Sequence, residues 1–139
     1  MGIDPRRIEF VGFMPVANYF QEYQRIDVAL DPFPYGGGTT TCDALWMGVP
    51  LISRQGRTAV SRAGFSILSN IGLPELVGNS PEQYVQIAAD LAGDLPRLAH
   101  LRATLRQRME RSPLMDARQF THDLENAYRT MWRQWVTKS

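Results

Sequence analysis

The residues best suited to chemistry in this chain form one short run, in which three glycines, Gly36–Gly38, precede three threonines, Thr39–Thr41. A short apolar segment, 27–31, comes before the run, and a helix-like pattern follows it. Glycines let the backbone approach a ligand closely, and the start of a helix offers unpaired N–H groups and the positive end of its dipole. The order of strand, glycine loop and helix therefore predicts a phosphate site, and hence a nucleotide or nucleotide-sugar site.

Each position of the run has an expected part in binding. Gly37 and Gly38 would let the backbone reach a diphosphate. Thr39 and Thr40 would donate N–H and hydroxyl groups to phosphate oxygens, and Asp43 would accept from a ribose or sugar hydroxyl. A capping box stays open as the alternative, because Thr40-x-x-Asp43 can satisfy the first helical N–H groups without a ligand. The run lacks the Lys-Ser/Thr ending of a P-loop and is not a G-x-G-x-x-G fingerprint.

Three residues outside the run are further candidates for nucleotide binding. Met14, in the turn after 8–11, would present a backbone edge to a base on which Tyr19 would stack, and Arg62 would reach a phosphate. Taken alone, each residue has a simpler explanation that the sequence favours. Met14 and Tyr19 suit ordinary packing of a loop and an amphipathic helix, and Arg62 suits a solvated or capping arginine.

The elements that position these residues follow from the apolar periodicity, which predicts an α/β fold. The expected strands are 8–11, 28–30 and 50–53, and the expected helices are about 18–25, 40–47 and 59–70. Strands that alternate with helices imply a Rossmann-like parallel sheet with right-handed crossovers.

Three apolar stripes predict that helices make up the rest of the chain, at 84–91, 95–109 and 120–135. The 139 residues are thus expected to form a single partial domain, with a nucleotide-sugar-binding part at 8–80 and a helical part at 81–137. A sheet of three strands leaves an edge open, which suggests that earlier strands of a larger α/β domain are absent.

Composition narrows the function classes. A net charge of +1 gives no strong attraction to nucleic acid or membrane, and neither is expected as a partner. A single cysteine excludes an internal disulfide, and no group of residues has metal-ligand spacing, so no metal is expected. The start of the chain lacks the apolar core of a signal peptide, and no apolar run reaches the roughly 20 residues of a membrane span. The expected location is the cytoplasm.

Several motifs together resemble a known family. They are the segment 27–50, which holds the glycine–threonine run, Gly56-x-Thr58-x-x-Ser61-Arg62, Gly72-Leu73-x-Glu75-Leu76-Val77, and Phe120-x-x-x-Leu124-Glu125-x-x-Tyr128-x-x-Met131-Trp132. The chain resembles the C-terminal catalytic lobe of protein O-linked N-acetylglucosamine transferases and of plant SPINDLY-type protein O-fucosyltransferases. The resemblance implies a GT-B fold, of which this chain is the later part of the C-terminal lobe. It also implies partners upstream: another catalytic lobe and tetratricopeptide repeats that select a protein acceptor.

The resemblance implies roles for individual residues. The diphosphate contacts of the family fall on Thr39 and Thr40, and the acidic residue near the ribose falls on Asp43. The turn that binds the base falls on Met14, and Tyr19 stands where the animal enzymes have a histidine beside the base.

Gly38 departs from the animal enzymes, which have a histidine there, and in this it is similar to the SPINDLY type. Both UDP-N-acetylglucosamine and GDP-fucose therefore remain candidate donors, with transfer of N-acetylglucosamine to Ser or Thr of proteins as the first choice. The resemblance implies an inverting transfer without a metal, in which helix N–H groups stabilise the leaving diphosphate. No catalytic residue is assigned, because the family's candidate bases lie upstream, and the chain alone is expected to be inactive. A GT-B enzyme acting on a small molecule or glycan and a non-catalytic binding module remain alternatives.

Overall fold

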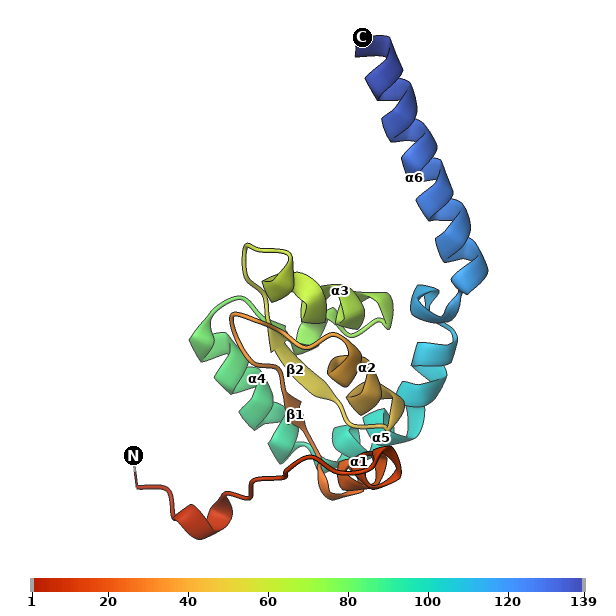
Figure 1. Cartoon of the computed structure of the whole chain (residues 1–139). Helices are drawn as coiled ribbons and strands as arrows, with labels where there is room; N and C mark the ends of the chain where they lie inside the picture. The colour runs from red at the N-terminus through yellow and green to blue at the C-terminus, as the bar shows by residue number, and fades with distance from the viewer. Residues whose placement is uncertain (1, 139) are drawn as a thin grey trace.

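The apolar run near 51 forms the central strand of a three-stranded parallel sheet in the computed structural model (Figure 1), which describes residues 2–138. The strands are β1 (Ala29–Leu30), β2 (Leu51–Arg54) and β3 (Val77–Gly78), in the spatial order β1-β2-β3. Ala29 lies opposite Leu51, and Ser53 lies opposite Val77. The first three residues of β2 are buried, as is typical of a parallel strand covered on both faces.

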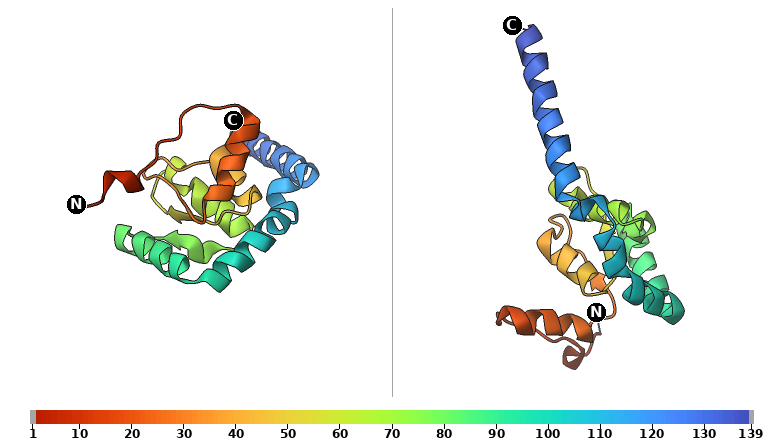
Figure 2. Two further views of the ribbon diagram at one scale, coloured as in Figure 1. Left: turned by 90° about the horizontal axis from the view of Figure 1, so that it is seen from below. Right: turned by 90° about the vertical axis from the view of Figure 1, so that its right-hand side faces the viewer.

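The helices of the chain lie around this sheet or, at the C-terminal end, extend away from it (Figure 2). They are α1 (Val16–Glu22), α2 (Thr39–Trp46), α3 (Ala63–Asn70), α4 (Pro81–Gly93), α5 (Leu95–Glu110) and α6 (Ala117–Lys138). Single 3-10 turns are η1 (Pro5–Arg7), η2 (Tyr23–Arg25), η3 (Val60–Arg62), η4 (Pro74–Leu76) and η5 (Pro113–Met115). Helix α4 covers β2 and β3 from one side, while α2 and α3 contact β2 from the other. The predicted alternation of strands and helices before a helical C-terminal part is confirmed.

One predicted strand is wrong. Residues 8–15 have no regular secondary structure and are largely exposed, with Phe10 93% accessible. The third strand is instead β3, which follows η4 late in the chain. β-branched and aromatic residues favour a strand only where a neighbouring strand and a packing surface are present, and none is present beside 8–11 within the described residues. A two-residue strand such as β3 has no periodicity from which it could be predicted.

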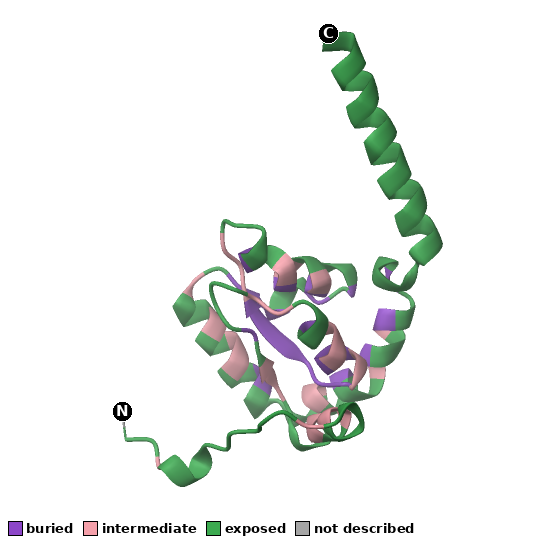
Figure 3. Ribbon diagram, viewed as in Figure 1, coloured by how far each residue is buried: buried purple, intermediate pink, exposed green. Residues whose placement is uncertain are grey.

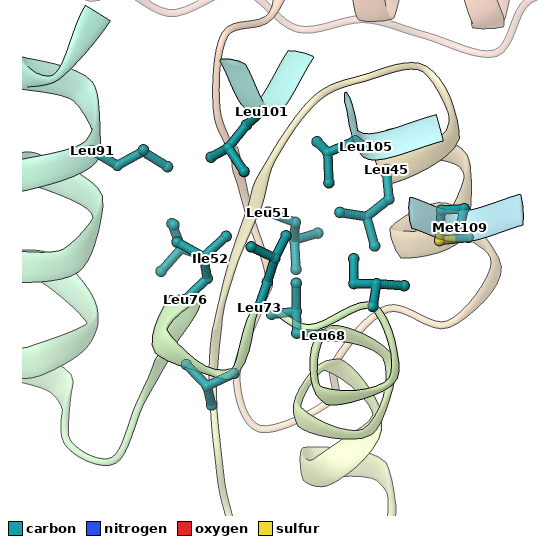
Figure 4. Close-up of a cluster of buried hydrophobic side chains, with 12 residues drawn as sticks. Leu45, Leu51, Ile52, Leu68, Leu73, Leu76, Leu91, Leu101, Leu105 and Met109 are labelled. Atoms are coloured by element: carbon teal, nitrogen blue, oxygen red, sulfur yellow. The ribbon is translucent and has the colours of Figure 1, made fainter. Parts of the chain in front are cut away.

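A single hydrophobic core lies on both sides of β2 (Figures 3 and 4). It is built from one or more leucines or isoleucines of each covering element, among them Leu45 of α2, Ile52 of β2, Leu68 of α3, Leu91 of α4 and Leu105 of α5. None of these five side chains is more than 1% exposed. This core fixes the position of α2 relative to the carboxyl ends of the strands.

Helix α6 projects away from the body (Figure 1). It forms over the stripe that predicts a helix at 120–135, but every residue of α6 that the structure describes is exposed (Figure 3). Among residues 2–138, no helix is both long enough and apolar enough to cross a membrane.

Candidate functional site

The glycine loop brings the start of α2 to the carboxyl edge of the sheet. Helix α2 begins at Thr39, with Gly38 as its N-cap residue at φ −119° and ψ −81°. No side chain caps this helix within the described residues, and the first N–H groups of a helix have no acceptor inside it. The loop therefore ends in a cluster of backbone donors that are available to a ligand.

The capping box, the alternative left open by the sequence, does not form. It requires Thr40 to be the N-cap residue and Asp43 to be the third residue of the helix. The helix instead has Gly38 as its N-cap and starts at Thr39, two residues earlier than the capping box requires, so that Asp43 is its fifth residue and lies in the second turn. Its carboxylate accepts a hydrogen bond from Tyr19 of α1, with 3.1 Å between Tyr19 Oη and Asp43 Oδ2.

Asp31, the first residue after β1, fixes the loop from inside the protein. Its side chain is buried, and Oδ1 accepts a hydrogen bond from the Gly37 N–H at 2.7 Å. Its Oδ2 accepts from the Ser53 hydroxyl of β2 at 2.6 Å. The sequence pattern places Asp31 at the end of the apolar segment 27–31 and indicates no role for its side chain. A carboxylate at a strand end, six residues before a glycine, was the signal that could have found it.

Gly37 is the position where the loop is most crowded. A Cβ atom there would lie 2.6 Å from Thr41 Oγ1 and 2.8 Å from Thr40 Oγ1, closer than real Cβ contacts. A Cβ atom on Gly38 would meet nothing within 4 Å. The two glycines are therefore not equivalent, because only Gly37 is required by a close approach.

A cavity of about 840 Å³ adjoins the start of α2. Segment 9–16, helix α1, turn η2 and Thr40 line it, with the residues Glu9, Val11, Gly12, Phe13, Met14, Val16, Tyr19, Glu22, Tyr23, Arg25, Ile26 and Thr40. Its size and its largely apolar and aromatic wall are typical of small-molecule sites. Three of the predicted site residues, Met14, Tyr19 and Thr40, thus lie around one cavity, although they come from three different segments.

Tyr19 is held in place by two polar neighbours. Its hydroxyl lies 2.6 Å from that of Tyr23, and the two rings meet edge to face at 5.3 Å between centroids. A hydroxyl has one proton, so Tyr19 donates it to Asp43 and accepts from Tyr23. Burial, together with these hydrogen bonds, raises the pKa of Tyr19 well above its ordinary value. The ring is thereby fixed at the wall of the cavity.

This shift predicts a loss of stability in alkaline solution. A folded-state pKa above the unfolded value of about 10 means that the unfolded chain releases its proton first, so stability falls as pH rises past about 10. We expect Tyr19→Phe to flatten the fall in the free energy of unfolding, measured in urea between pH 8 and 11. Tyr128→Phe, at an exposed position of α6, is the matched control and should leave the slope as it is. An unchanged slope in Tyr19→Phe would contradict the assignment of the alkaline loss of stability to Tyr19.

Five of the predicted site residues do not line the cavity: Gly37, Gly38, Thr39, Asp43 and Arg62. The first four belong to the glycine loop and α2, which adjoin the cavity, whereas Arg62 belongs to η3. It is exposed at the end of η3, and its guanidinium carbon lies 5.3 Å from the centre of the Phe65 ring. The loop that carries it does touch the glycine loop, since the Gly36 N–H donates to the Val60 carbonyl at 3.4 Å.

Among the described residues, no group of three or more His, Cys, Asp or Glu side chains lies close enough together to hold a metal.

A parallel sheet whose glycine loop leads into an uncapped helix beside an apolar cavity is typical of α/β domains that bind nucleotides. The chain belongs to glycosyl transferase family 41, whose profile matches residues 1–124. The family and the fold class predicted from the motifs are therefore confirmed.

Individual relatives agree with this assignment. The chain is 41% identical over 136 residues to the probable UDP-N-acetylglucosamine–peptide N-acetylglucosaminyltransferase SPINDLY of Petunia hybrida, covering 97% of this chain and 15% of the relative. It is 35% identical over 134 residues to the UDP-N-acetylglucosamine–peptide N-acetylglucosaminyltransferase of Caenorhabditis elegans, covering 96% and 12%. A solved structure of a mutant O-GlcNAc transferase from Thermobaculum terrenum superposes with a TM-score of 0.88 at 44% identity, covering 96% of this chain and 26% of that one. The chain thus spans about a seventh of the first of these relatives.

Proposed function

We propose that this chain is the donor-binding segment of a glycosyltransferase that moves N-acetylglucosamine from UDP-N-acetylglucosamine to Ser or Thr hydroxyls of proteins. The observation that carries the proposal is the uncapped start of α2, at the end of a glycine loop and beside a cavity. The names of the relatives add the choice of donor and acceptor, because they describe transfer of N-acetylglucosamine to peptides.

The proposed pose follows the shape of the site. The backbone of Gly37 and Gly38 and the N–H and hydroxyl groups of Thr39 and Thr40 would hold the diphosphate at the start of α2. The base would lie in the cavity, against the backbone at Met14 and the ring of Tyr19. Asp43 would meet the ribose between these two ends, because Tyr19 occupies only one of its carboxylate oxygens. Arg62 would need to leave its contact with Phe65 to reach a phosphate.

The part that this chain plays in the reaction would be electrostatic. As the acceptor oxygen bonds to the anomeric carbon, the bond from that carbon to the diphosphate breaks, and the electron pair goes to the diphosphate. Backbone donors at a helix start stabilise negative charge as it develops, without reorganising. We propose that these backbone donors stabilise the leaving diphosphate sufficiently without a bound metal. The base that takes the acceptor proton would come from another part of the longer protein.

The proposal extends to the whole protein. Donor binding is placed in 8–80, and 81–137 would support it, since α4 packs on the sheet. The protein acceptor, a second catalytic lobe and tetratricopeptide repeats would be contributed outside this chain. A cytoplasmic location accords with a single cysteine and can be tested by fractionation.

The test is an NMR titration of the labelled chain with UDP and then with GDP. We expect UDP to bind more tightly and to shift resonances within 36–43 and 14–19. Tighter binding of GDP would indicate that the donor is a GDP-linked sugar, such as GDP-fucose, and not UDP-N-acetylglucosamine. Absence of shifts with either nucleotide, both in this chain and in the full-length protein, would refute the donor site.

A further inference from the structure

We propose that Asp31 is a positioning residue of the donor site, whose buried carboxylate sets the glycine loop so that the start of α2 faces the diphosphate. The inference rests on the proposed function, because it concerns the same site. Asp31 itself would touch neither the nucleotide nor the sugar.

Asp31 is tied to three separate elements. Its backbone N–H donates to the Ile52 carbonyl of β2 at 2.9 Å, and its own carbonyl accepts from the Tyr84 hydroxyl of α4 at 3.1 Å. Its carboxylate accepts from Ser53 of β2 through Oδ2 and from the Gly37 N–H through Oδ1. The side chain therefore holds the Gly37 N–H of the loop in a fixed position relative to the sheet.

Two glycines let the backbone approach the carboxylate closely. A Cβ atom on Gly64 would lie 2.6 Å from Asp31 Oδ2, and one on Gly36 would lie 3.0 Å from the same atom. Asp31 is 5% exposed, and Ser53 is 2% exposed. None of the ion pairs between described residues involves Asp31. A buried carboxylate without a cation depends on its hydrogen-bond donors, and here one of the two is the loop itself.

The bond to Gly37 decides which loop groups remain for a ligand. Because the carboxylate takes the Gly37 N–H, the next backbone donors along the chain are those of Gly38 and the first turn of α2. On the other side of Gly37, the Thr41 hydroxyl is buried and has no hydrogen-bond partner among the described residues. Gly37 is thus confined between Asp31 and the helix, and loss of the carboxylate would release it.

The experiment compares three variants of the full chain by UDP affinity, urea unfolding and the amide resonances of Gly37 and Gly38. Asp31→Ala removes the bond to the loop, and we expect UDP binding to weaken at least tenfold with both resonances shifted in the free protein. Asp31→Asn keeps an oxygen that can accept from Gly37, and should restore affinity to within about threefold of the original chain. Ser53→Ala is the matched control, because it removes a partner of the same carboxylate and leaves the loop bond. Ser53→Ala should lower the free energy of unfolding and leave UDP affinity within about twofold of that of the original chain.

Three results would overturn the proposal. They are UDP affinity in Asp31→Ala within twofold of the original chain, equal losses in Ser53→Ala and Asp31→Ala, or failure of Asp31→Asn to restore binding. Should Asp31→Ala not fold, Asp31→Ser takes its place, since its hydroxyl keeps a polar group at the buried site but is one bond shorter than the carboxylate that holds the loop. Failure of the proposed function is distinguishable, because the original chain and the full-length protein would then bind no UDP at all.

Discussion

Replacing Thr39 and Thr40 together by alanine is expected to weaken UDP binding by about a hundredfold or more while the fold stays intact. A hydrogen bond to a charged group contributes about 1.5–3 kcal/mol, and two hydroxyl bonds to the diphosphate would be lost. Each 1.4 kcal/mol is tenfold in affinity, so the smaller estimate already gives about a hundredfold. The backbone N–H groups remain in the variant, which is why binding is weakened rather than abolished.

The same variant is expected to change stability little. Both threonines are exposed, neither caps α2, and alanine is a better helix former than threonine. Calorimetric titration with UDP and urea unfolding measure the two effects separately. Thr121→Ala, at an exposed position of α6, serves as the control for loss of a surface hydroxyl. A variant that unfolds would show that the threonines are structural, and unchanged affinity would place the diphosphate elsewhere.

Gly37→Ala is expected to abolish measurable UDP binding, and to lower the free energy of unfolding by about 1–3 kcal/mol, the usual cost of overpacking. The new Cβ atom would overlap the hydroxyl of Thr41, a residue that is 1% exposed. The loop must therefore shift away from α2, and the shift also pulls on the bond from Gly37 to Asp31.

Gly38→Ala is the matched control for this prediction. It adds the same methyl group one residue later, where nothing lies within 4 Å and φ is negative. We expect its stability to stay close to that of the original chain and its UDP affinity to fall much less than in Gly37→Ala, because the backbone N–H of residue 38 remains. Equal effects of the two substitutions, measured by urea unfolding and calorimetry, would show that the crowding at Gly37 is not what shapes the site.

The shape of the cavity could not be predicted from the sequence and depends on the tertiary structure. Residues 8–11 follow the pattern of a strand, yet segment 9–16 forms an exposed wall of the cavity, because no strand lies beside it in the part of the chain that the structure describes. The third strand, β3, is two residues long and forms because β2 offers an unpaired edge. β pairing depends on such distant neighbours, which a pattern of local residues does not contain.

The sequence by itself determined the glycine loop, the helix that follows it and the family, because these depend on residues that are adjacent along the chain. Only the tertiary structure decided how the side chains are used. Asp43 does not cap the helix, because α2 starts at Thr39, and its carboxylate accepts instead from Tyr19 of α1. Asp31 has its place because β2 and the loop donate to its carboxylate and Tyr84 of α4 donates to its backbone carbonyl. Hydrogen bonds between residues 6, 22, 24 and 53 positions apart leave no mark on local periodicity, and so the fold alone sets them.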